Sequence, residues 1–137
     1  MSKILIGHGM EIVAIDDIKS FLEQMGEDFV MEYFTATERR TSESGVNRIQ
    51  YFASRFCAKK AVLKALGLEL QQNSFWLEIE VQNLPTGEPS VVLNGKCQEI
   101  ADRLGLTKLL LSISHVSAYA AASAIAISKS SQALVLS

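Results

Sequence analysis

Apolar residues recur at helical spacing in two segments of this chain, and each segment predicts a helix. The first follows Asp16, a candidate N-cap, and ends at Gly26, a residue that commonly terminates helices. The second runs over 48–66, and Gly67 is a favourable C-terminal stop for it. The capping-box sequence that begins at Thr35 predicts a further short helix between them.

The capping box also sets a boundary. Glu38 stands three residues after Thr35, so its carboxylate can reach back to the Thr35 backbone while the threonine caps the helix. The segment 39–47 is polar, and we expect it to contain a loop before the longer helix.

Strict alternation of apolar and polar residues replaces the helical spacing in the second half. It predicts a strand over 76–81 with the odd-numbered residues, Leu77 among them, on one face. Turn-forming residues at 85–89 and a returning strand at 90–93 complete a hairpin. A strand hairpin therefore follows the longer helix.

The start of the chain predicts a short buried strand over 4–7. Gly7 and Gly9 flank one histidine, so the backbone turns there or approaches another segment closely. The segment 11–15 is expected to be extended or looped.

A helix over 96–104 and paired strands at 109–114 and 119–127 complete the pattern. The predicted fold class is α+β, with an antiparallel sheet wrapped around the long helix. We expect one domain over 1–128 and a C-terminal tail over 129–137.

Composition narrows the possible functions. The net charge is −2 and hydrophobic residues make up 48%, which is typical of a globular protein and gives no global sign of nucleic-acid binding. The N-terminal apolar run is too short for a signal peptide, and no run approaches the ~18 residues of a membrane span. We therefore expect a cytoplasmic protein without membrane or nucleic-acid partners. Its two cysteines form no disulfide framework.

Four cations crowd the segment 55–64 of the predicted long helix. Arg55 and Lys59 are four residues apart, as are Lys60 and Lys64, so like charges repel along it. One interpretation is a solvated basic face. The other is that a ligand with several phosphates lies against the helix.

His115 and Glu11 are further candidates for chemistry. His115 ends a predicted strand between small polar residues, where it could contact a phosphate or carry a proton. A hydrogen-bonded structural histidine is the alternative. Glu11 is a carboxylate just after the Gly-His-Gly segment. Cys57 is flanked by Phe56 and Ala58, and we interpret it as a packing residue.

Taken together, these motifs resemble the holo-acyl-carrier-protein synthase family of phosphopantetheinyl transferases. The motifs lie in the family's order between residues 4 and 127. They are Gly7–Val13, Phe34–Glu38, Ala53–Gly67, Gly87–Pro89 with Leu93–Gly95, and Ser112–His115 with Tyr119 and Ala120. The helix is the clearest, because its Arg-Phe-Cys-Ala-Lys-Lys run at 55–60 is similar to the family's Arg-Phe-Ala-Ala-Lys-Glu.

The resemblance implies a 4′-phosphopantetheinyl transferase-like fold and a homotrimer with active sites between subunits. It also implies transfer of the 4′-phosphopantetheine arm of coenzyme A to a serine of an acyl carrier protein, releasing adenosine 3′,5′-bisphosphate. Magnesium would bridge the pyrophosphate of the substrate. The residues implied in catalysis are Glu11, Lys60, Lys64 and His115, and those implied in binding coenzyme A are Arg55, Lys59, Lys64, Gly67 and His115.

Two departures concern the metal. Glu11 replaces the family's metal-binding Asp, and Lys60 replaces its metal-binding Glu. An ammonium cannot ligate magnesium, so Glu11 stays as the single protein ligand of this pair. The change from Glu to Lys alters the local charge by as much as the lost ion carries. We hypothesise that Lys60 pairs with Glu11 or with the pyrophosphate and stands in for magnesium.

A third departure lies in the first predicted helix, which the family uses to present basic residues to its carrier protein. Acidic residues outnumber the single Lys19 in this region and oppose an acidic partner; they are Asp16, Asp17, Glu23, Glu27 and Asp28.

Two functions stay open from the sequence. One is an active transferase with a dedicated carrier protein. The other is a non-catalytic member that binds coenzyme A without magnesium or serves as a partner subunit. A purely structural trimer would leave the basic helix unexplained.

Overall fold

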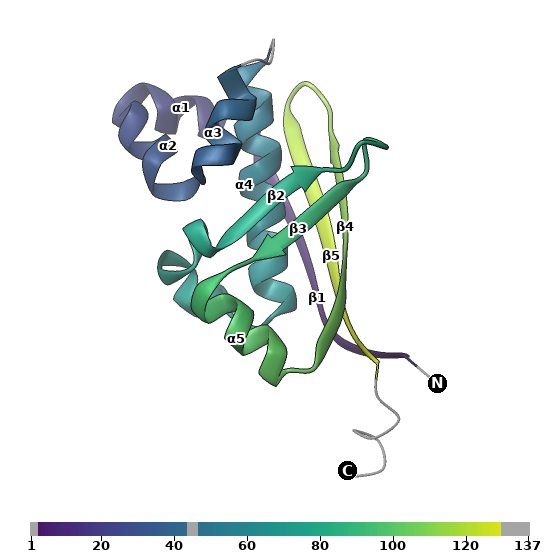
Figure 1. Cartoon of the computed structure of the whole chain (residues 1–137). Helices are drawn as coiled ribbons and strands as arrows, with labels where there is room; N and C mark the ends of the chain where they lie inside the picture. Colours follow the sequence, from purple (N-terminus) through teal and green to yellow (C-terminus); the bar gives the residue numbers. More distant parts are fainter. Residues whose placement is uncertain (1–2, 44–46, 130–137) are drawn as a thin grey trace.

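The computed structural model describes residues 3–43 and 47–129 (Figure 1). Its helices are α1 (Ile15–Met25), α2 (Glu27–Tyr33), α3 (Ala36–Glu43), α4 (Arg48–Ala65) and α5 (Gly95–Arg103), with 3₁₀ turns at Glu69–Ser74 and Trp76–Glu78. Its strands are β1 (Lys3–Ala14), β2 (Ile79–Asn83), β3 (Pro89–Leu93), β4 (Leu106–His115) and β5 (Tyr119–Lys129).

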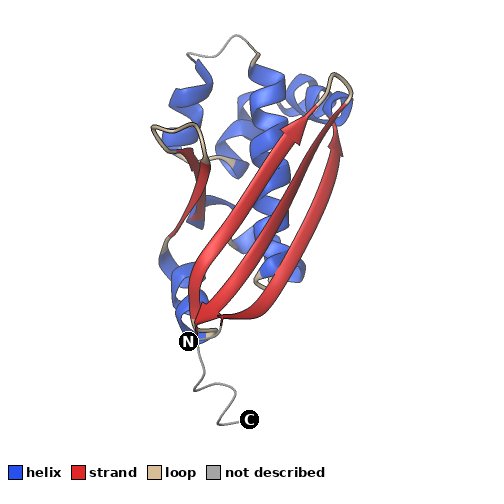
Figure 2. Ribbon diagram, turned by 90° about the vertical axis from the view of Figure 1, so that its right-hand side faces the viewer, coloured by secondary structure: helices blue, strands red, loops and turns tan. Residues whose placement is uncertain are grey.

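The long helix α4 is the centre of the molecule. An antiparallel sheet of order β1-β5-β4 covers one side of it, and the hairpin β2-β3 with helices α1–α3 covers the other (Figure 1). The opposite face of the three-stranded sheet carries no described helix or strand (Figure 2). The α+β class and the antiparallel sheet predicted from the sequence are confirmed.

Helix α4 lies directly on the backbone of β1. A Cβ added at Gly9 would lie 2.1 Å from the Ala61 carbonyl oxygen, and one at Gly7 would lie 1.7 Å from that of Ala65. Gly7 and Gly9 both have a negative or extended φ. Glycine is therefore needed at these positions for the close approach of α4 and not for a turn. Strand β1 is therefore continuous, which corrects the predicted short strand.

Small residues also allow the helix to approach β5. Ala120, Ala124 and Ala126 are fully buried on the face of β5 that meets α4. Most residues of α4 are buried, so the helix packs against other elements on most of its sides. The sequence pattern had indicated a single apolar stripe along the helix. Gly67 ends it at a φ of 73°, as predicted.

The structure confirms the capping box and the β2-β3 hairpin and corrects three local predictions. Ala14, not Asp16, is the N-cap of α1. Leu77 is 52% exposed because its segment forms a 3₁₀ turn before the strand begins. Helix α2 was not predicted, and α3 occupies part of the polar segment expected to contain a loop.

The predicted tail lies outside the described residues beyond position 129. None of the helices in the described ranges combines the length and the apolar character that a membrane span needs.

Candidate functional site

The first candidate site is a carboxylate–lysine cluster made of Glu11, Lys60 and Lys64. Lys64 Nζ lies 2.8 Å from Glu11 Oε1, and Lys60 Nζ lies 4.0 Å from Glu11 Oε2. Lys64 also donates to the Met10 carbonyl at 3.2 Å. The predicted pairing of Lys60 with Glu11 is confirmed.

Alternation along β1 creates this cluster. Gly9 and Glu11 both lie on the face of β1 that meets α4. Because Gly9 has no side chain, the helix comes close enough for its lysines to reach the Glu11 carboxylate. Lys60 and Lys64 are one turn apart and so share a helix face. The Cys57 thiol donates to the Glu11 carbonyl at 3.2 Å, which fixes the strand beside the helix.

The electrostatics of the cluster follow from these contacts. The hydrogen bond to Glu11 raises the pKa of the Lys64 ammonium, so Lys64 stays charged at neutral pH. Burial, followed by the Glu11 charge, raises the pKa of Cys57 to about 12. Cys57 is therefore a protonated packing residue, as interpreted from its neighbours, and not a nucleophile.

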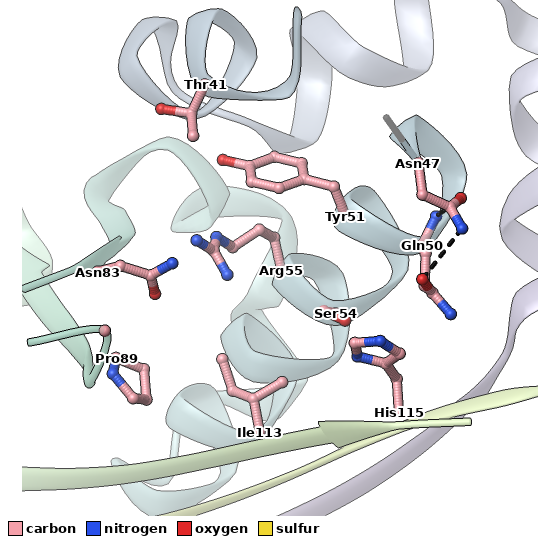
Figure 3. Close-up of a pocket in the computed structure, with 11 residues that line it drawn as sticks. Thr41, Asn47, Gln50, Tyr51, Ser54, Arg55, Asn83, Pro89, Ile113 and His115 are labelled. Atoms are coloured by element: carbon pink, nitrogen blue, oxygen red, sulfur yellow. Dashed lines mark hydrogen bonds between the residues drawn. The ribbon is translucent and has the colours of Figure 1, made fainter. Parts of the chain in front are cut away.

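The second candidate site is the Arg55 cavity, a hollow of about 590 Å³ between α4, the hairpin and the end of β4 (Figure 3). It contains both Arg55 and His115. Its other lining residues are Thr41, Asn47, Gln50, Tyr51, Ser54, Asn83, Gly87, Pro89 and Ile113.

Arg55 is held in this cavity with unused hydrogen-bonding capacity. Its side chain lies against the ring of Tyr51, with Cζ 4.7 Å from the ring centroid, and the residue is only 7% exposed. Within the described residues, the buried Arg55 Nε has no hydrogen-bond partner. A buried guanidinium with an open donor is suited to an anionic ligand.

Lys59 does not belong to either site. Its ammonium lies 2.6 Å from Glu38 Oε1, and both side chains are fully buried. It also donates to the carbonyls of Tyr33 at 2.8 Å and Trp76 at 2.9 Å. Burial lowers the pKa of Lys59, and the Glu38 charge opposes that shift. Protein acceptors enclose the Lys59 ammonium, so this structure gives no support to the assignment of Lys59 to coenzyme A binding, which stays a prediction.

The structure thus divides the predicted basic face. Arg55 faces a cavity, Lys59 is buried, and Lys60 and Lys64 share a carboxylate from β1. Neither a solvated stripe nor one continuous phosphate-binding face describes the helix. Gly67 serves as the end of α4, and its proposed contact with coenzyme A stays a prediction.

Sequence reasoning missed several lining residues. Tyr51 stands four residues before Arg55, and helical spacing could have identified it as a neighbour of the guanidinium. Asn83 belongs to the hairpin, and no neighbouring residue in the sequence indicates that it lines the cavity. Its position in the cavity depends on how the hairpin packs against α4.

The carboxylate–lysine cluster does not fit a magnesium ion. Magnesium requires oxygen ligands in near-octahedral geometry, whereas Glu11 offers a single carboxylate that already faces two ammonium groups. In the described part of the chain, no group of three or more His, Cys, Asp or Glu side chains could hold a metal.

Comparison with known proteins agrees with the fold and the motifs. The model of the 4′-phosphopantetheinyl transferase superfamily matches residues 7–124. The holo-[acyl-carrier-protein] synthase of Koribacter versatilis is 35% identical over 122 residues, covering 89% of this chain and 98% of that protein. The chain therefore belongs to the 4′-phosphopantetheinyl transferase superfamily.

Solved structures of relatives share the whole architecture. The Plasmodium yoelii acyl carrier protein synthase, solved with ADP bound, matches with a TM-score of 0.83 at 29% identity, covering 95% of this chain and 100% of that one. A Bacillus anthracis holo-(acyl-carrier-protein) synthase, solved in complex with CoA (3′,5′-ADP), matches with a TM-score of 0.75 at 27% identity, covering 91% and 98%. The family resemblance drawn from the motifs is confirmed.

Proposed function

We propose that this chain transfers the 4′-phosphopantetheine arm of coenzyme A to a serine of an acyl carrier protein. The observation that carries the proposal is the Arg55 cavity, which the largely buried Arg55 lines together with His115. A phosphorylated ligand supplies the oxygen acceptors that an arginine guanidinium prefers. Relatives named holo-[acyl-carrier-protein] synthase, at 33–42% identity, support the same transferase activity.

The reaction requires little covalent chemistry from the protein. The carrier serine Oγ attacks the phosphorus that bears the pantetheine arm, and the bond from that phosphorus to the bridging oxygen breaks. Adenosine 3′,5′-bisphosphate leaves, and the serine proton is released. Positioning and neutralisation of the phosphates then dominate catalysis. We assign these roles to Arg55 and His115 on one side and to Lys60 and Lys64 on the other.

These two groups lie at different places on one chain. Arg55 and His115 line the larger cavity, whereas Glu11, the partner of Lys60 and Lys64, lines a separate hollow of about 170 Å³ formed by β1, β4 and β5. A homotrimer would bring the carboxylate–lysine cluster of one subunit against the Arg55 cavity of the next. We therefore propose that each active site is shared between two subunits.

The outer face of the sheet supports the proposed trimer. Met10 is 60% exposed, Ile12 67% and Leu110 40%. They pair with Ser123, Ala121 and Ile125 of β5, which alternate with the buried alanines that face α4, so these side chains lie on the opposite, uncovered face of the sheet. Apolar residues that gather on an open sheet face favour burial against another copy of the chain.

The carrier protein that fits this chain is less acidic than the family's usual partner. The acidic residues of α1 and α2 are exposed, and among them Glu27 is neutralised by Arg48 at 2.7 Å. The remaining negative charges repel an acidic carrier surface and slow its association.

The proposal is tested by incubating the protein with coenzyme A and a panel of apo carrier proteins of graded charge. Intact mass spectrometry then measures the added phosphopantetheine. We expect modification of at least one carrier, faster for less acidic carriers and lost in Arg55→Ala. Lys96→Ala, an exposed change on α5, is the control and keeps full activity. No modification of any carrier would contradict the proposed function.

A further inference from the structure

Charge balance suggests what replaces the metal. Glu11, Lys60 and Lys64 carry one negative and two positive charges, so the cluster has a net charge of +1 without any ion. A pair of carboxylates beside the same Lys64, neutralised by one divalent cation, would carry the same net charge. The Lys at position 60 therefore restores the balance that a metal would otherwise supply.

Geometry places the Lys60 ammonium where it can act on a ligand. Its side chain is 33% exposed, and the Glu11 side chain is 13% exposed. Lys60 Nζ lies 5.7 Å from the centroid of the Phe56 ring, which itself stacks on Trp76 at 5.1 Å. The aromatic pair limits the directions that the Lys60 chain can take, so the ammonium is positioned rather than freely solvated.

The contact between Lys60 and Glu11 leaves hydrogen bonds unused. At 4.0 Å the two groups are too far apart for a hydrogen bond, whereas Lys64 bonds Glu11 at 2.8 Å. Glu11 is thus held mainly by Lys64, and the Lys60 donors stay available to a second anion. An incoming phosphate oxygen can take them without breaking the bond between Glu11 and Lys64.

We infer that Lys60 and Lys64 together hold the diphosphate of the substrate in place of a divalent cation, so that coenzyme A binds without metal. This inference rests on the proposed function, since it describes how the same site binds its substrate. Two ammonium groups repel a divalent cation that approaches Glu11, which disfavours magnesium even where it is abundant. They also offer charged donors to both phosphates of the ligand.

Calorimetric titration of coenzyme A into the full chain, once with EDTA and once with excess magnesium, tests the inference. We expect the two dissociation constants to agree within about twofold. Lys60→Met weakens binding about tenfold in both buffers, because it removes one charge-assisted contact. Lys96→Ala, an exposed lysine on α5, is the matched control and leaves binding unchanged.

A second variant is expected to show the opposite behaviour, namely binding that depends on magnesium. Lys60→Glu combined with Glu11→Asp returns both carboxylates of the family pattern. We expect this variant to bind coenzyme A weakly in EDTA and at least about tenfold more tightly with magnesium. Wild-type binding that appears only with magnesium would overturn the inference and leave the proposed function standing. Absence of binding in both buffers would overturn the proposed function itself.

Discussion

Replacing Lys59 with Met lowers the free energy of unfolding by about 3–5 kcal/mol, the cost expected when one partner of a buried ion pair is removed. The change leaves the Glu38 carboxylate buried with only the backbone N–H groups of Thr35 and Val81 as donors. It also leaves the carbonyls of Tyr33 and Trp76 without the Lys59 ammonium. Urea unfolding followed by circular dichroism measures the loss.

Lys60→Met is the matched control for this prediction. It removes the same charge from the next residue of the same helix, but Lys60 is partly exposed, so we expect a loss of less than about 1 kcal/mol. A Lys59→Met, Glu38→Gln double variant should lose less than the sum of its single changes, because the two groups interact. Equal effects of Lys59→Met and Lys60→Met would contradict the structural role of Lys59.

Replacing Gly9 with Ala destabilises the fold by about 3 kcal/mol, the upper part of the range for overpacking. The new methyl group would lie 2.1 Å from the Ala61 carbonyl oxygen and 2.7 Å from Lys64 Cβ, so α4 must move away from β1. That movement also separates Lys64 from Glu11. We therefore expect weaker coenzyme A binding together with a lower midpoint of urea unfolding.

Ser20→Ala on the exposed face of α1 serves as the control for the glycine and should change stability by less than about 0.5 kcal/mol. A Gly9→Ala protein that unfolds at the wild-type urea concentration would mean that the helix does not rest on the strand.

Local chemistry was sufficient to predict several elements. Thr35 and Glu38 form their reciprocal hydrogen bonds at 3.3 and 2.9 Å because both partners lie within one turn. Gly67 ends α4 because a residue of positive φ is needed there. Such features depend on a few neighbouring residues, so the sequence alone identifies them.

Long-range packing explains what the sequence concealed. Lys59 appeared as part of a basic stripe because its partner Glu38 belongs to a different helix. Gly7 and Gly9 were compatible with a turn because the helix that requires them lies far along the chain. Glu11 joins Lys60 and Lys64 only once β1 has packed on α4. The candidate site was therefore identified in its residue types, but its division into two clusters required the fold.

We propose that these two clusters form one active site between subunits, and mixing two inactive variants tests the shared site most directly. Lys64→Ala damages the carboxylate–lysine cluster, and His115→Ala damages the Arg55 cavity. The two variants are unfolded, mixed and refolded together. In the proposed trimer, random assembly then restores an intact site wherever the undamaged halves of two subunits meet. We expect about a quarter of the wild-type phosphopantetheinyl transfer by intact mass of the carrier, since each site draws one half from each of two subunits. A mixture that stays as inactive as the separate variants would contradict the shared site.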